Sequence, residues 1–166
     1  MTASTPFILR LASTFGLGQM RPFPGTWGSI PPVILAAVLL FAGAPLWLYT
    51  LTLLAVLVVF ALVCILAGDR AEARWGRKDP SQVVADETAG QCLPLLFLPG
   101  SALASPSLIL FTLFLAFVAF RLFDIFKLWP ARGIQKTPGG WGILLDDLVA
   151  GLQALLFLQI LSRAFT

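Results

Sequence analysis

The sequence of 166 residues contains no histidine, and this absence excludes several kinds of active site. Without an imidazole there is no phosphohistidine chemistry, no Ser-His-Asp triad and no histidine ligand for a metal. Any metal site must therefore use oxygen atoms or the two thiols, Cys64 and Cys92. Both cysteines lie in or beside apolar segments, where a free cysteine behaves as a small hydrophobic side chain, and we expect both to be reduced.

Charge is scarce as well. Only 11% of the residues are charged, whereas 58% are hydrophobic and the mean hydropathy is +0.92. A soluble domain of this size could not bury so many apolar side chains, and the composition indicates a membrane protein. The net charge of +3 is too small and too scattered to indicate a nucleic-acid partner, but it suits a protein that faces anionic lipid headgroups.

Long uncharged runs predict membrane helices. Residues 30–68 carry no charge, and because one span needs roughly 20 apolar residues, this run holds two helices with a turn at Gly43-Ala44-Pro45. Further apolar segments predict a second hairpin over about 83–126 and a last helix over about 141–165. We expect an all-α, polytopic bundle of about four transmembrane helices. Residues 1–166 form one domain that includes an N-terminal interfacial segment.

Two details of this bundle stay open in the sequence. The segment around Cys92 is short, so it either spans the bilayer fully or enters and returns. Helices of this length could also form a homodimer.

The hairpins place three polar segments on one side of the membrane. Residues 1–29, 69–87 and 121–147 then lie together and hold ten of the eleven Lys and Arg residues, while Arg163 lies on the other side. The positive-inside rule makes the crowded side cytoplasmic.

Five carboxylates lie at the edges of apolar runs in these segments: Asp86, Glu87, Asp124, Asp146 and Asp147. A charge at the bilayer centre costs about 2.5–3.5 kcal/mol, so these groups must reach the interface, pair with bases or bind a cation. An acidic pair at a helix end is also typical of a solvated cap. Two such pairs and a fifth acid on one side favour a metal site, and oxygen ligands without histidine favour magnesium.

Basic residues and hydroxyls accompany these acids. Arg121, Asp124 and Lys127 follow the spacing i, i+3, i+6 and share one helix face, which fits a phosphate site and a local ladder of salt bridges equally well. A loop at residues 24–29 could present backbone N–H groups and hydroxyls to an anion, although an ordinary helix cap explains it too. Its candidate binding residues are Gly25, Thr26, Gly28 and Ser29.

Several segments together resemble the phosphatidylglycerophosphatase A family. They are, in order, Gly16–Ser29 with its Pro24-Gly25-Thr26-Trp27-Gly28-Ser29 core, Asp86-Glu87-Thr88-Ala89-Gly90, Phe120–Lys127 with Trp129-Pro130, Gly139-Gly140-Trp141-Gly142-Ile143, and Asp146–Gly151. The sequence departs from the family pattern at Leu128, where proline is usual, and at Pro138, where some relatives have histidine.

The resemblance implies magnesium-dependent hydrolysis of the terminal phosphate of phosphatidylglycerophosphate, a phospholipid substrate in the membrane, to give phosphatidylglycerol. It implies an enzyme of the bacterial cytoplasmic membrane with its site facing the cytoplasm. The five carboxylates would form the acidic centre, with metal ligands among Asp86, Glu87, Asp146 and Asp147. The segment around Thr26, together with Arg121 and Lys127, would bind substrate.

Two other functions stay open from the sequence. A CDP-alcohol phosphotransferase is one, because Asp69, Arg74, Gly76 and Asp79 partly match the signature of that class. A small non-enzymatic transporter is the other, although transporters place such carboxylates nearer the midplane than the helix ends.

Overall fold

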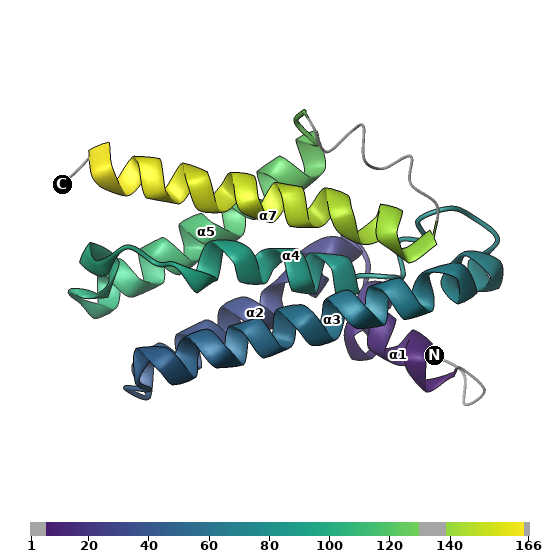
Figure 1. Cartoon of the computed structure of the whole chain (residues 1–166), viewed down its shortest axis with the longest axis horizontal. Helices are drawn as coiled ribbons and strands as arrows, with labels where there is room; N and C mark the ends of the chain where they lie inside the picture. The colour runs from purple at the N-terminus through teal and green to yellow at the C-terminus, as the bar shows by residue number, and fades with distance from the viewer. Residues whose placement is uncertain (1–5, 130–138, 165–166) are drawn as a thin grey trace.

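The computed structural model describes residues 6–129 and 139–164, so Pro130 and Pro138 lie outside the described residues. The described residues form helices and contain no strand (Figure 1). In chain order these are α1 (Phe7–Ala12), the 3₁₀ helix η1 (Thr14–Gln19), α2 (Pro24–Phe41), α3 (Leu46–Trp75), α4 (Ala85–Leu96), the 3₁₀ helix η2 (Gly100–Leu103), α5 (Pro106–Phe126) and α7 (Gly139–Ala164).

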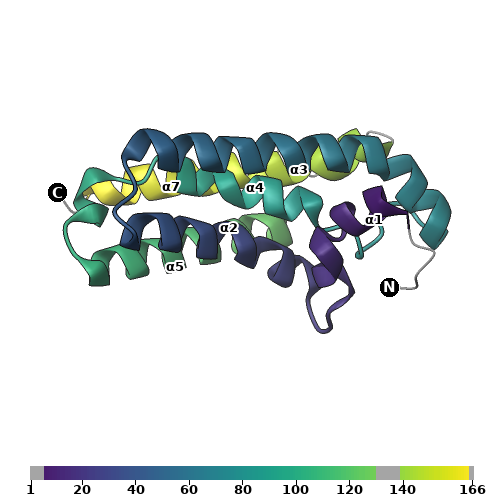
Figure 2. The same cartoon turned by 90° about the horizontal axis from the view of Figure 1, so that it is seen from below.

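Four of these helices, α2, α3, α5 and α7, are long and apolar enough to cross a membrane. Their outer faces carry exposed apolar side chains, such as Leu54, Val58 and Leu62 of α3, that suit contact with lipid. The prediction of an all-α bundle with about four transmembrane helices is therefore confirmed. The N-terminal α1 packs against α3, near the end of that helix which carries most of its charges (Figure 2).

Helix α4 lies inside the bundle, where it packs against α2, α3, α5 and α7 (Figure 2). Ten of its 12 residues are buried, including Cys92. A helix of this length is about 18 Å long, too short for a hydrocarbon core of about 30 Å. The segment around Cys92 therefore does not cross the bilayer as a helix by itself. Residues 97–105, which contain η2, connect it to the start of α5.

Helix α2 begins at Pro24, in the first turn where proline is tolerated. Residues 25–29, which the sequence placed in a loop, therefore form the first turns of a helix. Pro32 lies inside this helix and has no N–H for the carbonyl of Gly28, four residues earlier. The hydroxyl of Thr88 in α4 lies 2.8 Å from that carbonyl oxygen and can donate in its place.

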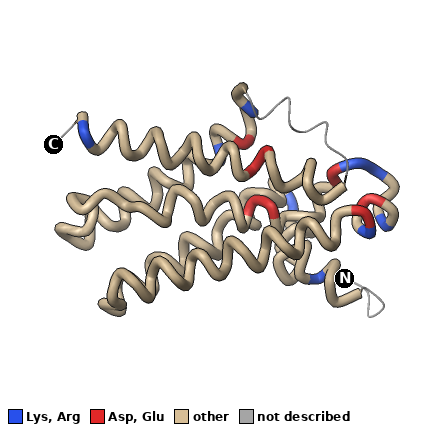
Figure 3. Tube along the Cα trace, viewed as in Figure 1, with Lys and Arg blue, Asp and Glu red and all other residues tan. Residues whose placement is uncertain are grey.

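Charged residues gather in one half of the bundle, and a single basic residue near the C-terminus marks the other end (Figure 3). That residue is Arg163, in the last turn of α7.

Candidate active site

Two glycines let α4 and α7 approach closely. A Cβ at Gly151 would overlap the backbone oxygen of Gly90, and a Cβ at Gly90 would lie 2.7 Å from the backbone oxygen of Asp147. Larger residues at either position would force the helices apart, since such distances are shorter than any normal contact. The first turn of α4 therefore lies beside the acidic turn of α7.

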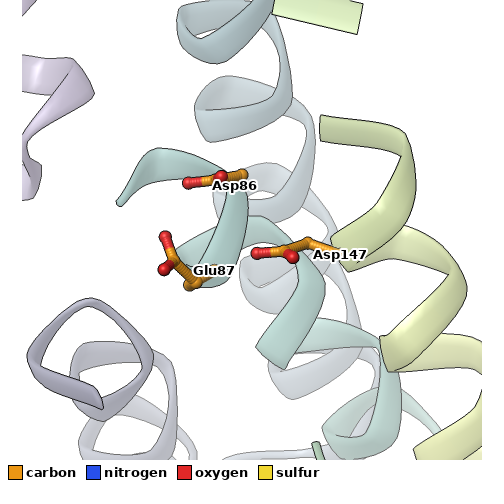
Figure 4. A group of neighbouring side chains, drawn as sticks. All are labelled: Asp86, Glu87 and Asp147. Atoms are coloured by element: carbon orange, nitrogen blue, oxygen red, sulfur yellow. The ribbon is translucent and has the colours of Figure 1, made fainter. Parts of the chain in front are cut away.

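This contact assembles an acidic cluster of three residues, Asp86, Glu87 and Asp147. Each contributes one carboxylate oxygen, and these oxygens lie within 4.8 Å of one another. Figure 4 shows Asp147 pointing from α7 toward the two acids of α4. Asp86 is 5% exposed and Asp147 3% exposed. Glu87 is half-buried. Three negative charges so close together, two of them buried, would repel one another strongly, so a cation or bound protons must neutralise the cluster.

The pKa values of the two acids in α4, Asp86 and Glu87, reflect this crowding. Burial, with the neighbouring charges of Glu87 and Asp147, raises the pKa of Asp86 well above its usual range. Burial likewise raises the pKa of Glu87 to about 7, while its hydrogen bond with Asp86 and the charge of Arg121 act in the opposite direction. Without a cation, the cluster therefore binds protons near neutral pH.

The donor chemistry of the cluster fits a hard cation. All the donors are carboxylate oxygens, which magnesium and calcium prefer. Asp86 Oδ1, Glu87 Oε2 and Asp147 Oδ2 are buried and have no hydrogen-bond partner among the described residues. A divalent ion would satisfy these oxygens and offset their charge.

Arg121 of α5 borders the cluster. Its Nη1 lies 2.6 Å from Asp124 Oδ2 and 4.0 Å from Glu87 Oε1. The same nitrogen lies 3.5 Å from the Ser29 hydroxyl oxygen of α2. Gly25 lies against Glu87 and Arg121, and a Cβ there would come 2.9 Å from Arg121 Nη2. The first turns of α2 therefore border the site. Gly25 can lie against it because glycine has no side chain, and Ser29 contributes a hydroxyl.

Lys127 and Asp146 form a second polar pair. The Lys127 ammonium donates to Asp146 Oδ2. Burial would lower the pKa of Lys127, but the hydrogen bond and the charge of Asp146 outweigh this effect and raise the pKa above its ordinary value. Lys127 therefore remains charged beside the cluster.

The other residues of the expected anion-binding segment have a different setting. Gly28 packs against Val84, where a Cβ on the glycine would come 2.6 Å from the valine Cβ. Thr26 is half-buried in the first turn of α2, and its N–H donates to the backbone oxygen of Phe23. Gly28 thus serves the packing of α2 on the start of α4.

Two polar residues near the site were absent from the set expected from the sequence. Asp79 precedes α4 and is half-buried; burial raises its pKa, and the charge of Lys127 opposes this shift. Gln91 follows Glu87 by one helical turn and is fully buried. The available signals were an Asp-Pro pair shortly before the acidic pair, and an amide within an apolar run.

Comparisons with known proteins identify the family of the chain. The family model described as phosphatidylglycerophosphatase A matches residues 10–162. A phosphatidylglycerophosphatase A of Haemophilus influenzae is 34% identical over 152 residues, covering 88% of this chain and 83% of that protein. The Escherichia coli protein of the same name is 31% identical over 152 residues, covering 90% of this chain and 79% of its own length.

A third relative carries a different name. A Bacteroides thetaiotaomicron protein, provisionally named a phosphatidylinositol-3-phosphatase, is 33% identical over 157 residues and is matched over 90% of both chains. No solved structure matches the chain.

Proposed function

The chain belongs to the phosphatidylglycerophosphatase A family, and from this premise we propose that it hydrolyses the terminal phosphate of phosphatidylglycerophosphate to give phosphatidylglycerol, with magnesium as cofactor. The observation that carries the proposal is the acidic cluster with Arg121 at its edge, 4.0 Å from Glu87. Carboxylates that can hold a cation, next to a guanidinium that can bind phosphate oxygens, are the parts that phosphoryl transfer requires.

Asp86, Glu87 and Asp147 would hold the ion. When bound, magnesium supplies positive charge for the phosphoryl oxygens and lowers the pKa of an attacking water. We assign Asp146 a different role from the ligand role expected from the sequence. It pairs with Lys127 and keeps that ammonium at the edge of the cluster.

Arg121 and Lys127 bind the phosphate and share the charge that develops on its oxygens. Asp124 fixes the guanidinium of Arg121 through their 2.6 Å ion pair. Gly25 lets Glu87 and this guanidinium lie directly against the first turn of α2, because a side chain there would overlap both groups. The water oxygen bonds to phosphorus as the bond to the glycerol oxygen breaks. A carboxylate of the site accepts the proton from water and then returns it to the glycerol oxygen, which leaves as the alcohol.

The membrane setting follows from the distribution of charge. We propose that the protein lies in the bacterial cytoplasmic membrane with the acidic cluster facing the cytoplasm, supported by the basic residues that gather in the same half of the bundle (Figure 3). The lipid then presents its headgroup from the cytoplasmic leaflet while its acyl chains stay in the bilayer.

Phosphate release from purified phosphatidylglycerophosphate tests both parts of the proposal. We expect activity in detergent micelles that is lost on chelation and restored by added magnesium. Activity that is indifferent to chelation would remove the metal from the mechanism. Absence of phosphate release at any magnesium concentration would reject the assigned reaction.

A further inference from the structure

We propose that an apolar groove between α5 and α7 binds an acyl chain of the lipid substrate. The inference rests on the proposed function, since it concerns how that site recognises a lipid. This α5–α7 groove has a volume of about 230 Å³. Its lining is entirely apolar: Ala119, Leu122, Phe123, Phe126, Leu128 and Phe157.

The groove and the polar site use different faces of the same turns of α5. Leu122 follows Arg121, Phe123 precedes Asp124, and Leu128 follows Lys127. Successive helical residues point about 100° apart, so the end of α5 presents its charged groups to the site and its apolar groups to the groove. Lys127 follows Phe123 by four residues and precedes Leu128, so a lipid with its phosphate at Lys127 would find hydrocarbon-lined space beside that cation.

One stripe of residues along α7 also changes from polar to apolar. Asp146, Gln153 and Phe157 lie on one face because their spacings of seven and eleven residues are close to whole helical turns. Asp146 binds Lys127, and Gln153 Nε2 donates to the backbone oxygen of Trp129 at 3.1 Å. The stripe from Asp146 to Phe157 covers about 16 Å, at a rise of 1.5 Å per residue. It thus passes from the charged site through an amide to an aromatic wall of the groove.

The volume of the groove and the exposure of its lining residues suit part of one acyl chain. A methylene occupies about as much space as a water molecule, whose share of liquid volume is about 30 Å³, so the groove holds about eight methylenes. Leu122, Phe126 and Leu128 are exposed at the outer surface of the bundle. The chain can therefore enter sideways from the bilayer, with the remainder extending into surrounding lipid.

Two other apolar grooves are less suited to this occupant. The α2 groove, beside Trp27, Ile30 and Ile34, lies on the face of α2 turned away from Gly25. The groove at the far end of α5 and α7 lies around Ser101 and Ser162. It borders η2 rather than the acidic cluster. The α5–α7 groove, in contrast, begins beside Lys127, a cation that complements an anionic headgroup.

A tryptophan that fills the groove tests this assignment. In Leu122→Trp we expect kcat/KM for dioleoyl phosphatidylglycerophosphate to fall about tenfold or more, because pocket contacts of methylene size are worth about 10–200-fold. Hydrolysis of the same headgroup phosphate without acyl chains should be unchanged. Leu110→Trp is the matched control, because Leu110 is 55% exposed on the same helix and lies outside the groove. Equal behaviour of the two variants on both substrates would overturn the assignment.

Direct labelling covers the case in which Leu122→Trp disturbs the fold. Phosphatidylglycerophosphate with a photoreactive group in its acyl chain should label Leu122, Phe126 or Phe157 of the unmodified protein. Excess unlabelled substrate should compete, and phosphatidylcholine should not. Labelling spread evenly over the outer helix faces, or concentrated at Ile30 and Ile34, would overturn the assignment. If the unmodified protein released no phosphate from either substrate, the proposed reaction would fail, whereas the labelling pattern would still decide the fate of the groove.

Discussion

Asp146 and Asp147 are neighbours in the sequence, yet they face different partners. Asp147 joins Asp86 and Glu87 in the acidic cluster, whereas Asp146 accepts a hydrogen bond from Lys127. Consecutive residues of a helix point about 100° apart, so one turn of α7 presents an acid to α4 and another to the end of α5. The two acids should therefore respond differently to the same substitution.

We expect Asp147→Asn to weaken magnesium binding by about 100-fold or more, because groups that only support a ligand already contribute about 10–100-fold. Asp146→Asn should leave the metal affinity within about tenfold and raise KM, because it frees Lys127. Magnesium titrations of thermal unfolding and steady-state phosphate release measure both quantities. Equal losses of metal affinity would place Asp146 among the ligands.

The sequence predicted the acidic centre but not its division into two groups. Which acids meet depends on how closely α4 approaches α7, and that distance depends on Gly90 and Gly151. A sequence gives the helix face of each residue, whereas the separation of two helices depends on the whole bundle. The sequence alone therefore could not show which acids Asp147 would meet.

The start of α2 shows a second limit. The uncharged run predicted a helix that begins near residue 30, after a loop at residues 24–29. In the structure the hydroxyl of Thr88 lies 2.8 Å from the oxygen of Gly28, so a partner far away in the sequence can replace the donor that Pro32 lacks. The four membrane helices were predictable because they depend on local hydropathy alone.

Magnesium affinity should depend on pH. Burial raises the pKa of Glu87 to about 7 and places that of Asp86 well above its usual range. Protons therefore compete with the cation below these values. We expect the dissociation constant for magnesium to decrease by about tenfold from pH 6 to pH 7 for each displaced proton. An affinity that is constant from pH 6 to pH 8 would contradict the role of Glu87 in binding the ion.

The free energy of unfolding without magnesium should fall as the pH rises, whereas the affinity for magnesium should increase. Between its ordinary pKa and the raised pKa of about 7, folded Glu87 binds more protons than the unfolded chain does, so the free energy of unfolding falls as the pH rises. Chelation should therefore lower the unfolding temperature more at pH 8 than at pH 6. The measurement is thermal unfolding in detergent with and without chelator, in matched buffers.

Arg121 should be required for catalysis. Its guanidinium contacts Asp124 and lies 4.0 Å from Glu87, at the edge of the cluster where we place the phosphate. We expect Arg121→Gln to lower kcat by about 100–1,000-fold, the usual effect of losing a preorganised donor to the transition state. Arg163→Gln is the control, because this residue lies at the far end of α7 and should leave the rate unchanged. A rate loss below a few-fold in Arg121→Gln would separate this residue from the reaction.

The contact of α4 with α7 should be needed for both stability and metal binding. In Gly151→Ala the new methyl group would overlap the backbone oxygen of Gly90, and it would lie 2.9 Å from Leu93 Cδ1. We expect a cost of about 1–3 kcal/mol, as for other overpacked sites, and weaker magnesium binding because the helices must separate. Gly100→Ala should change neither, since no described residue other than its two chain neighbours comes within 4 Å of its Cβ position. The double variant Gly151→Ala, Leu93→Ala distinguishes the two contacts. It removes the contact of the new methyl group with Leu93 Cδ1, whereas the contact with the backbone oxygen of Gly90 remains. If the double variant regained full stability and magnesium affinity, the Leu93 contact would set the distance between the helices. If it did not, the backbone contact between Gly151 and Gly90 would set that distance.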